Sequence, residues 1–380
     1  MSGLLVAADR ALLADGSLSP GWVEVADGLV LATGRGEPPR TPDRRVAVLT
    51  PGLVDIHCHG GGGHTFATTD PQEARAAADA HHRAGTTTVL ASLVSDTHET
   101  LREQVRTLAP LVREGVLGGI HLEGPWLSPL HHGAHDPGVL RDPDPGELQD
   151  LLAAGDGTVR MVTLAPERPG GLDAVRLLAE AGVVVAVGHT DVDGDQLRTA
   201  VDAGARVVTH LCNAMRPIHH RRPGPVVAAL ADERLAVELI VDGVHVHDEV
   251  VALIARSARS RLLLVSDAMA AACAPDGRYQ LGAMAVDVVD GVARTTDSGR
   301  IAGSTLTLDR AVRGTTAAGV DTLAALTAAT ASPARTLGLT AGVLRPDAPA
   351  DLVGLDADLH VRWVLRGGAG AGAGTTRTTS

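Results

Sequence analysis

The chain has 380 residues, of which 44% are hydrophobic, so it can build a large core and is not a mostly disordered protein. Its net charge of −12 argues against nucleic acid and anionic membranes as main partners. All 33 basic residues are arginine. Enzymes that need a lysine are therefore excluded, among them pyridoxal phosphate enzymes, P-loop NTPases and protein kinases, as is a carboxylated-lysine metal bridge.

The N-terminal residues and the cysteines bear on the compartment. Cys58, Cys212 and Cys273 are too few, and odd in number, to form a disulfide framework, which suits a reducing compartment. The first residues lack a basic region, and the sequence has no apolar run of 18 or more residues. We therefore expect a soluble, cytoplasmic protein without a signal peptide.

The two ends of the chain have a similar texture. Residues 1–50 alternate short apolar runs with turns, which is typical of a small β-meander, and residues 340–366 do the same. Together they predict one small β-sandwich domain formed from both termini. The low-complexity segment 367–380 is predicted to be disordered.

The middle of the chain, residues 51–339, alternates apolar runs with helical stretches. Eight short runs are expected to be strands buried on both faces, at 53–59, 86–94, 117–124, 159–167, 183–190, 206–213, 236–243 and 262–268. Eight such units favour a (β/α)₈ barrel over an open sheet. A β-hairpin insertion is expected at about 276–300, before a last helical stretch.

Polar residues that suit metal binding follow these strands. They are His57, His59, Glu123, His189, His210, His245 and Asp267. Because the strands of a barrel all end on one face, and that face carries the chemistry, we expect these side chains to converge. Neutral imidazoles with a carboxylate suit Zn²⁺, Fe²⁺ or similar divalent ions.

Several of these residues also have a structural alternative. Two histidines at positions i and i+2 point to one side of a strand, but roughly one such pair is expected by chance among 17 histidines. Glu123 could be a helix cap, although without lysine a two-metal site needs a carboxylate bridge. Asp267 could be an N-cap, or it could move the proton of a metal-activated water.

Several motifs occur in order between about residues 50 and 340: PGLVDIHCHG, HLEGPWLSP, VGHTD, THLCNAMRPIHHRRPG, VDGVHV, VSDAM and IAGSTLTL. With these motifs the chain resembles the N-acetylglucosamine-6-phosphate deacetylases of the amidohydrolase superfamily. The resemblance implies a metal-dependent hydrolase barrel that converts N-acetyl-D-glucosamine 6-phosphate and water to D-glucosamine 6-phosphate and acetate. It also implies a homodimer in amino-sugar catabolism and cell-wall recycling, with one or two divalent metals, zinc first and iron, cobalt or manganese as alternatives.

The resemblance assigns roles to matched positions. Glu123, His189 and His210 correspond to metal ligands, and His57 and His59 to a second metal site. Asp267, beside the metal, corresponds to the catalytic acid and base, and His245 to a residue that binds or polarises the reacting group. The substrate-contacting positions are Ala134, His135, Asn213, Ala214, Arg221, His245, Ile301, Ala302, Gly303 and Ser304. Either Arg221 or its neighbour Arg222 is expected to bind the phosphate.

Two other functions remain open at this point. One is a different amidohydrolase, such as a dihydroorotase-like or deaminase-like enzyme, although these commonly need a carboxylated lysine or a different histidine order. The other is a metal-binding or sugar-phosphate-binding protein without catalysis, which the complete ligand set and Asp267 disfavour. Release of acetate, measured with and without a chelator, separates these functions.

Overall fold

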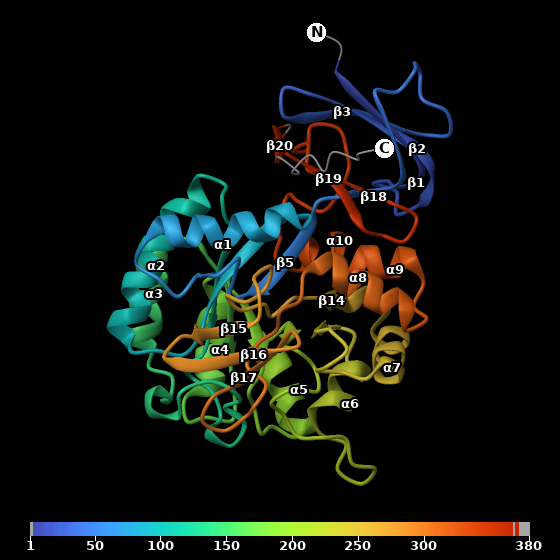
Figure 1. Cartoon of the computed structure of the whole chain (residues 1–380). Helices are drawn as coiled ribbons and strands as arrows, with labels where there is room; N and C mark the ends of the chain where they lie inside the picture. The colour runs from blue at the N-terminus through green and yellow to red at the C-terminus, as the bar shows by residue number, and fades with distance from the viewer. Residues whose placement is uncertain (1–2, 368, 372–380) are drawn as a thin grey trace.

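The computed structural model describes residues 3–367 and 369–371, and its main feature is a parallel barrel (Figure 1). Eight parallel strands are hydrogen-bonded in the order β14-β13-β12-β11-β10-β9-β8-β5. They are β5 (Leu53–Cys58), β8 (Thr86–Leu93), β9 (Gly119–Glu123), β10 (Val159–Leu164), β11 (Val184–Val187), β12 (Val207–Val208), β13 (Ala236–Leu239) and β14 (Leu262–Leu264). A parallel bridge between Cys58 and Ala268 joins the two ends of the sheet. The predicted (β/α)₈ barrel is confirmed.

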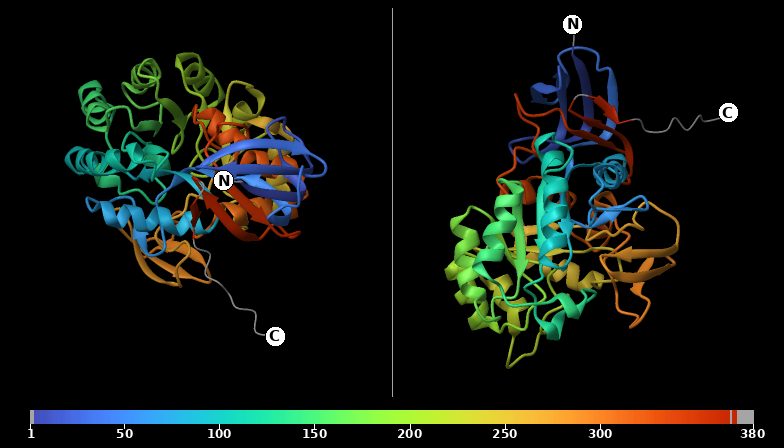
Figure 2. Two further views of the ribbon diagram at one scale, coloured as in Figure 1. Left: turned by 90° about the horizontal axis from the view of Figure 1, so that it is seen from above. Right: turned by 90° about the vertical axis from the view of Figure 1, so that its left-hand side faces the viewer.

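Helices cover the outside of the barrel, as Figure 2 shows from two further directions. They are α1 (Pro71–Arg83), α2 (His98–Arg113), α3 (Pro145–Gly155), α4 (Gly171–Glu180), α5 (Gly194–Ala203), α6 (Gly224–Ala231), α7 (Asp248–Ala258), α8 (Leu308–Ala317), α9 (Thr322–Ala328) and α10 (Ala331–Thr336). The helix α1 illustrates how the sequence sets their ends. Asp70 caps its first turn by accepting a hydrogen bond from the Gln72 amide, and Pro71 suits the first helical position. Alanines then line its buried face. Within the described residues, none of the helices combines the length and apolar character needed to cross a bilayer.

Strands from both ends of the chain form a second sheet above the barrel in Figure 1. Its seven strands are hydrogen-bonded in the order β20-β19-β18-β4-β1-β2-β3. They are β1 (Leu4–Leu12), β2 (Leu18–Ala26), β3 (Leu29–Arg35), β4 (Arg44–Pro51), β18 (Leu352–Leu355), β19 (Val361–Arg366) and β20 (Ala369–Ala371). The sandwich expected here takes the form of one continuous hydrogen-bonded sheet. The segment 367–380 was expected to be disordered, but Ala369–Ala371 form β20, which pairs with β19. Residues 368 and 372–380 lie outside the described residues.

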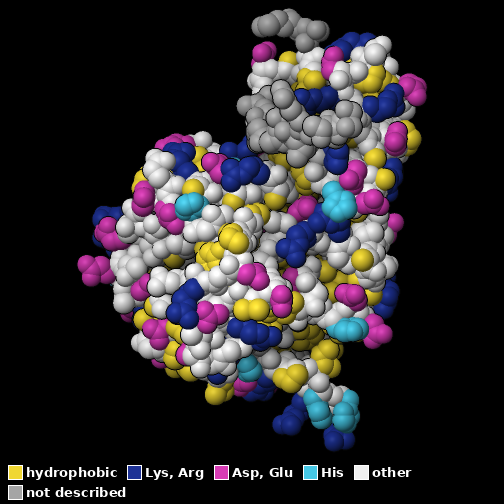
Figure 3. All heavy atoms as spheres, in the orientation of Figure 1, with side chains coloured by type: hydrophobic (Ala, Val, Ile, Leu, Met, Phe, Trp, Pro, Cys, Tyr) yellow, Lys and Arg dark blue, Asp and Glu magenta, His cyan; other side chains and the backbone are white. Residues whose placement is uncertain are grey.

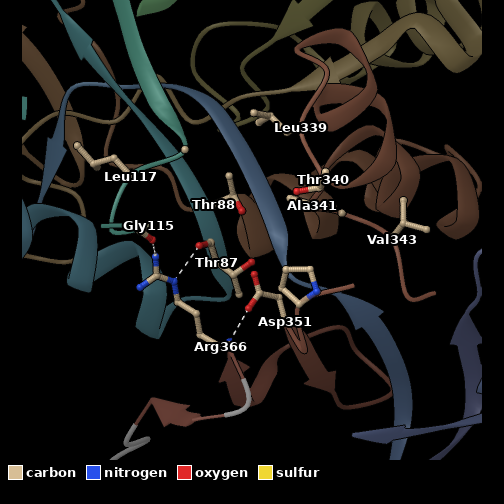
Figure 4. Close-up of a pocket in the computed structure, with 14 residues that line it drawn as sticks. Thr87, Thr88, Gly115, Leu117, Leu339, Thr340, Ala341, Val343, Asp351 and Arg366 are labelled. Atoms are coloured by element: carbon tan, nitrogen blue, oxygen red, sulfur yellow. Dashed lines mark hydrogen bonds between the residues drawn. The ribbon is translucent and has the colours of Figure 1, made fainter. Parts of the chain in front are cut away.

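A cavity of about 450 Å³ lies between this sheet and the barrel, at the end where the barrel strands begin (Figure 4). Arg366 connects the two parts: its Nε donates to the Thr87 carbonyl over 3.1 Å, and its Nη2 donates to the carbonyls of Gly115 and Val116. Asp351 accepts a hydrogen bond from the Gly367 amide over 2.7 Å. The predicted metal-binding and catalytic residues lie at the opposite ends of the barrel strands.

The insertion after β14 is a small three-stranded antiparallel sheet rather than the expected two-stranded hairpin. Its strands are β15 (Gly277–Leu281), β16 (Met284–Val289) and β17 (Val292–Thr295). Leu281 and Val286 pack with Val94 and Met269 in a hydrophobic cluster of their own. This cluster fixes the small sheet over the end of the barrel that carries the predicted site.

Candidate metal centre and active site

Six side chains predicted from the sequence as metal ligands meet at the carboxyl ends of the barrel strands. They are His57, His59, Glu123, His189, His210 and Asp267, here called the donor cluster. Each is at most 8% exposed. Several of the strands end at or just before these residues: for example, β12 stops at Val208, although a strand was expected over 206–213.

The backbone explains why those strands stop. His189, His210 and Asp267 have φ angles of 47°, 27° and 47°, in the left-handed region that a strand cannot continue through. Such conformations cost free energy and occur preferentially at functional sites. Gly303, which lies beside Asp267, has a φ of 59°, and a Cβ there would come within 2.9 Å of the Asp267 carbonyl oxygen.

Glu123 lies at the centre of the donor cluster. Its Oε1 is 3.1 Å from His210 Nε2, 3.2 Å from His189 Nε2 and 3.4 Å from His57 Nε2. Its other oxygen, Oε2, is 3.2 Å from His59 Nε2. Oε1 therefore faces His189, His210 and His57, and Oε2 faces His59. The carboxylate contacts imidazoles on both sides of the cluster, as expected of a carboxylate that links two metal positions.

Asp267 lies beside the histidine pair of β5. Its Oδ1 is 3.2 Å from His59 Nε2 and 3.4 Å from His57 Nε2. We call His57, His59 and Asp267 the first donor group, and His189 and His210 the second donor group. Glu123 contacts both.

The outer nitrogens of three imidazoles define their tautomers. Each Nδ1 faces an oxygen that can only accept, so it must carry the hydrogen, and a neutral ring then presents a bare Nε2 to the cluster. The acceptors are Glu238 Oε2 for His57 (3.0 Å), the Ser92 carbonyl for His59 (3.1 Å) and the His131 carbonyl for His189 (2.9 Å). His210 Nδ1 has no hydrogen-bond partner among the described residues.

These bare nitrogens approach one another closely. His57 Nε2 is 3.2 Å from His59 Nε2, and His189 Nε2 is 3.0 Å from His210 Nε2. Two lone pairs at that distance repel unless a proton or a cation lies between them. The donor set of imidazoles and carboxylates therefore fits a divalent metal such as zinc.

The pKa shifts of the cluster residues also indicate that a positive charge is stabilised there. Burial lowers the pKa of His59, but hydrogen bonds and charge interactions with Asp267 and Glu123 outweigh it and raise the pKa to about 9. The pKa of His57 is raised well above its usual range, chiefly by Glu123 against the effect of burial. The imidazoles in turn hold the pKa values of Glu123 and Asp267 below their usual range, although burial opposes this.

His135 differs from the cluster histidines. Its Nδ1 accepts the amide hydrogen of Ser95 over 3.2 Å, so the hydrogen of a neutral ring is on Nε2, which lies 3.4 Å from Glu123 Oε2. Burial, with the neighbouring His189, lowers the pKa of His135 to about 4 and keeps the ring neutral. The Nε2 hydrogen of His135 therefore faces Glu123.

His245 follows β13 and is held by Asp242. Its Nδ1 donates to Asp242 Oδ2 over 2.7 Å, which leaves Nε2 as the ring nitrogen available to a ligand. Asp242 also accepts the amide hydrogens of Val244 and His245, both over 2.8 Å. Burial opposes protonation of His245, but the bond to Asp242 prevails and raises its pKa.

A cavity of about 180 Å³ opens onto the donor cluster. Its lining residues come from the strand ends, the following loops and the small antiparallel sheet. They are His59, Val94, Glu123, Gly133, Ala134, His135, His189, His210, Asn213, Ala214, His245, Asp267, Leu281, Ile301 and Gly303. The cavity therefore gathers most of the substrate-contacting positions that the resemblance implies.

Three of those positions do not line the cavity, and two of these three are buried behind it. Ala302 is fully buried and packs in the hydrophobic cluster under the small sheet. The Ser304 hydroxyl donates to the Ser266 carbonyl over 2.6 Å, and the Ser304 amide donates to the Asp267 carbonyl over 2.7 Å. Ser304 thus supports the backbone at Asp267 from behind.

Arg221 also lies apart from the cavity. It and Arg222 belong to the exposed 216–223 loop before α6, which projects from the body of the protein in Figure 1. Arginine and histidine side chains gather on this projection in Figure 3. Arg216, on the same loop, pairs with Asp191 over 2.8 Å.

The sequence reasoning missed Glu238, which holds His57, and Leu281, which lines the cavity. The signal for Glu238 was a single carboxylate within the apolar run of β13. Leu281 had no such signal, because only the packing of β15 over the barrel brings it to the cavity.

Comparison with known proteins agrees with this architecture. Residues 48–372 match the model of the Amidohydrolase family. The chain is 38% identical to the N-acetylgalactosamine-6-phosphate deacetylase of Escherichia coli O157:H7, over 94% of this chain and 96% of that protein. It is 33% identical to the N-acetylglucosamine-6-phosphate deacetylase of Bacillus subtilis (strain 168), over 82% of each.

Solved structures extend the similarity to the whole fold. One is the D267A mutant of the N-acetyl-D-glucosamine-6-phosphate deacetylase from Mycobacterium smegmatis in complex with N-acetyl-D-glucosamine-6-phosphate. It has 49% identity and a TM-score of 0.94, over 98% of this chain and 100% of that one. The N-acetylglucosamine-6-phosphate deacetylase of Thermotoga maritima has 30% identity and a TM-score of 0.87, over 98% and 99%. The chain therefore belongs to the amidohydrolase family.

Proposed function

We propose that this protein is a metal-dependent deacetylase that hydrolyses the acetamide of N-acetyl-D-glucosamine 6-phosphate. The products are D-glucosamine 6-phosphate and acetate. The observation that carries the proposal is the donor cluster, in which Glu123 is surrounded by bare imidazole nitrogens at the floor of a cavity that Asp267 and His245 also line.

The cluster residues would hold the metal. Glu123, His189 and His210 would bind one divalent ion, and His57, His59 and Asp267 would bind a second, with zinc proposed first and iron, cobalt or manganese as alternatives. When bound, such a metal lowers the pKa of water and polarises a carbonyl. The cluster is buried, which limits competition from bulk water for these donors.

Asp267 is placed to act as the base and then the acid. Its pKa lies below the usual range despite burial, so the carboxylate is ionised and can accept a proton from the attacking water. The new carbon–oxygen bond forms at the acetamide carbon, and the carbon–nitrogen bond then breaks. Asp267 returns the proton to the leaving amine, which departs as the amino sugar while acetate remains.

His245 is placed to stabilise the oxygen on which charge develops. Asp242 fixes its Nδ1 hydrogen and raises its pKa, so its Nε2 can be protonated and donate toward the carbonyl oxygen. Ala134, His135, Asn213, Ala214, Ile301 and Gly303 would surround the sugar.

The phosphate needs a cationic partner, because a chain at −12 repels anions at long range. We propose Arg221, whose guanidinium can bind phosphate through two hydrogen bonds. The 216–223 loop is exposed and projects outward, and Ile218 on it is 54% exposed. This position suits contact with the cavity of a second copy in a homodimer, which is the assembly that the resemblance implies. We propose that the enzyme acts in the cytoplasm.

A second candidate substrate is the galactosamine epimer, since a relative covering nearly the whole chain is an N-acetylgalactosamine-6-phosphate deacetylase. The higher identity to the Mycobacterium smegmatis enzyme favours the glucosamine form. The test measures acetate released from each 6-phosphate, before and after chelation and after zinc is returned. Release from neither substrate by the zinc-loaded protein would refute the proposal.

A further inference from the structure

Glu238 is a carboxylate in the middle of strand β13 that is fully buried, at 0% exposure. It lines no part of the cavity and belongs to no motif on which the family resemblance rests. Burying a carboxylate is unfavourable unless it is paired and hydrogen-bonded. The contacts of Glu238 therefore indicate what the residue does.

Those contacts lead to the donor cluster. Glu238 Oε2 accepts the Nδ1 hydrogen of His57 over 3.0 Å and the backbone amide hydrogen of His210 over 3.2 Å. Its other oxygen has no hydrogen-bond partner among the described residues. Because β14 lies between β13 and β5 in the barrel, the contact with His57 is a tertiary one that strand pairing does not explain.

The contact determines which face of His57 a metal would meet. A carboxylate accepts but does not donate here, so the His57 hydrogen is on Nδ1 and its Nε2 is bare. That Nε2 lies 3.4 Å from both Glu123 Oε1 and Asp267 Oδ1. Without Glu238, the ring could equally carry its hydrogen on Nε2 and turn away.

The other imidazoles with defined tautomers are held differently. His59 and His189 donate to the backbone carbonyls of Ser92 and His131, which are uncharged. His57 alone among these three donates to a full negative charge. A carboxylate on the outer nitrogen fixes the ring and increases the basicity of the ligating nitrogen.

We propose that Glu238 is a positioning residue that makes the first donor group, His57, His59 and Asp267, competent to bind a second divalent cation. It does so by holding the His57 ring with Nε2 directed at Glu123 and Asp267. This inference rests on the proposed function only for the identity of the site as a metal centre. Its test is metal binding, so a failure to release acetate would leave it standing.

The experiment uses the full chain, stripped with a chelator and titrated with Zn²⁺ by calorimetry, with bound zinc counted by elemental analysis. The wild type should bind about two ions. Glu238→Leu should weaken the second ion by about 10–100-fold, as expected for loss of an outer carboxylate, and lower the retained zinc toward about one. Glu238→Gln keeps an acceptor oxygen without the charge, so its affinity for the second ion should fall less, by about several-fold.

Gln104→Leu is the matched control. It makes the same kind of polar-to-apolar change at a buried position of helix α2, outside the donor cluster, so both ions should bind as in the wild type. In a His57→Asn background, Glu238→Gln should have no further effect on the second ion, because it would act only through His57.

Three results would overturn the proposal. The first is a wild-type chain that binds one zinc ion only. The second is unchanged affinity for the second ion in Glu238→Gln, the variant with the smallest risk of misfolding. The third is equal loss in the wild-type and His57→Asn backgrounds, which would make Glu238 a general structural residue of β13.

Discussion

Without its metal, this protein should lose free energy of unfolding as the pH rises from about 6.5 to about 9. The stabilisation that a bound metal provides should instead grow over the same range. In the stripped protein a proton takes the place of the cation among the bare nitrogens of the donor cluster. The pKa of His59 is about 9 in the folded chain, raised by Asp267 and Glu123 against burial. A free histidine has a pKa of about 6.5.

The sign follows from these two values. A group with a raised pKa binds its proton more tightly when folded, so its stabilisation is complete below about pH 6.5 and is lost as the pH passes about 9. The difference of about 2.5 pKa units corresponds to roughly 3 kcal/mol. We count one proton for this pair, because His57 Nε2 and His59 Nε2 are only 3.2 Å apart and one proton between them satisfies both.

The assay is urea unfolding followed by circular dichroism at pH 6.5, 7.5 and 9, with a chelator present throughout. The free energy of unfolding of the wild type should fall by about 3 kcal/mol across this range, whereas His59→Asn should show a much smaller decrease. With zinc instead of chelator, the stabilisation by metal should grow with pH, since the metal displaces protons from its ligands.

A flat or rising profile for the stripped wild type would refute this account of the cluster. A decrease that is equally large in His59→Asn would place the titration elsewhere in the chain.

Four further predictions concern binding and catalysis. Glu123→Gln should lose most bound metal and all acetate release, because an amide nitrogen replaces an acceptor oxygen between the imidazoles; wild-type metal content would contradict this. Asp267→Asn should lower kcat by about 10²–10⁴-fold, the usual contribution of a general acid–base, and an unchanged kcat would exclude that role. The double variant His57→Asn with His59→Asn should bind about one ion in place of about two, with some activity left; unchanged stoichiometry in elemental analysis would make the pair structural. Arg221→Ala should raise KM for the 6-phosphate, through a loss of roughly 2–3 kcal/mol of binding free energy, and leave slow turnover of unphosphorylated N-acetylglucosamine unaffected. An equal loss of activity on both substrates would show a structural role.

Much of the barrel could be predicted from local sequence. Strands buried on both faces must be apolar throughout, so runs such as residues 86–94 and 159–167 stand out between helical segments. The strand lengths were less predictable. Residues 206–213 include only two strand residues, because His210 takes a left-handed backbone that hydrophobicity does not signal.

The convergence of the donor cluster followed from a general property of barrels. Once parallel strands were expected, polar residues at their ends had to share one face, so His189 and Asp267 could be assigned to one site from the sequence. The sequence did not predict which residues within a motif face the cavity. Gly303 lines it while Ala302 packs in the core, since the local backbone decides the direction of each side chain.

The barrel and the candidate donor residues could be inferred from the amino-acid sequence alone, because both depend on local apolar runs and on the order of strands. How these donors are held follows only from contacts between distant parts of the chain. The pairing of His57 with Glu238 joins residues 181 positions apart in sequence, and the projection of Arg221 away from the cavity depends on the path of one loop. Such contacts arise from the closure of the barrel, which brings side chains together without leaving any periodic pattern along the chain.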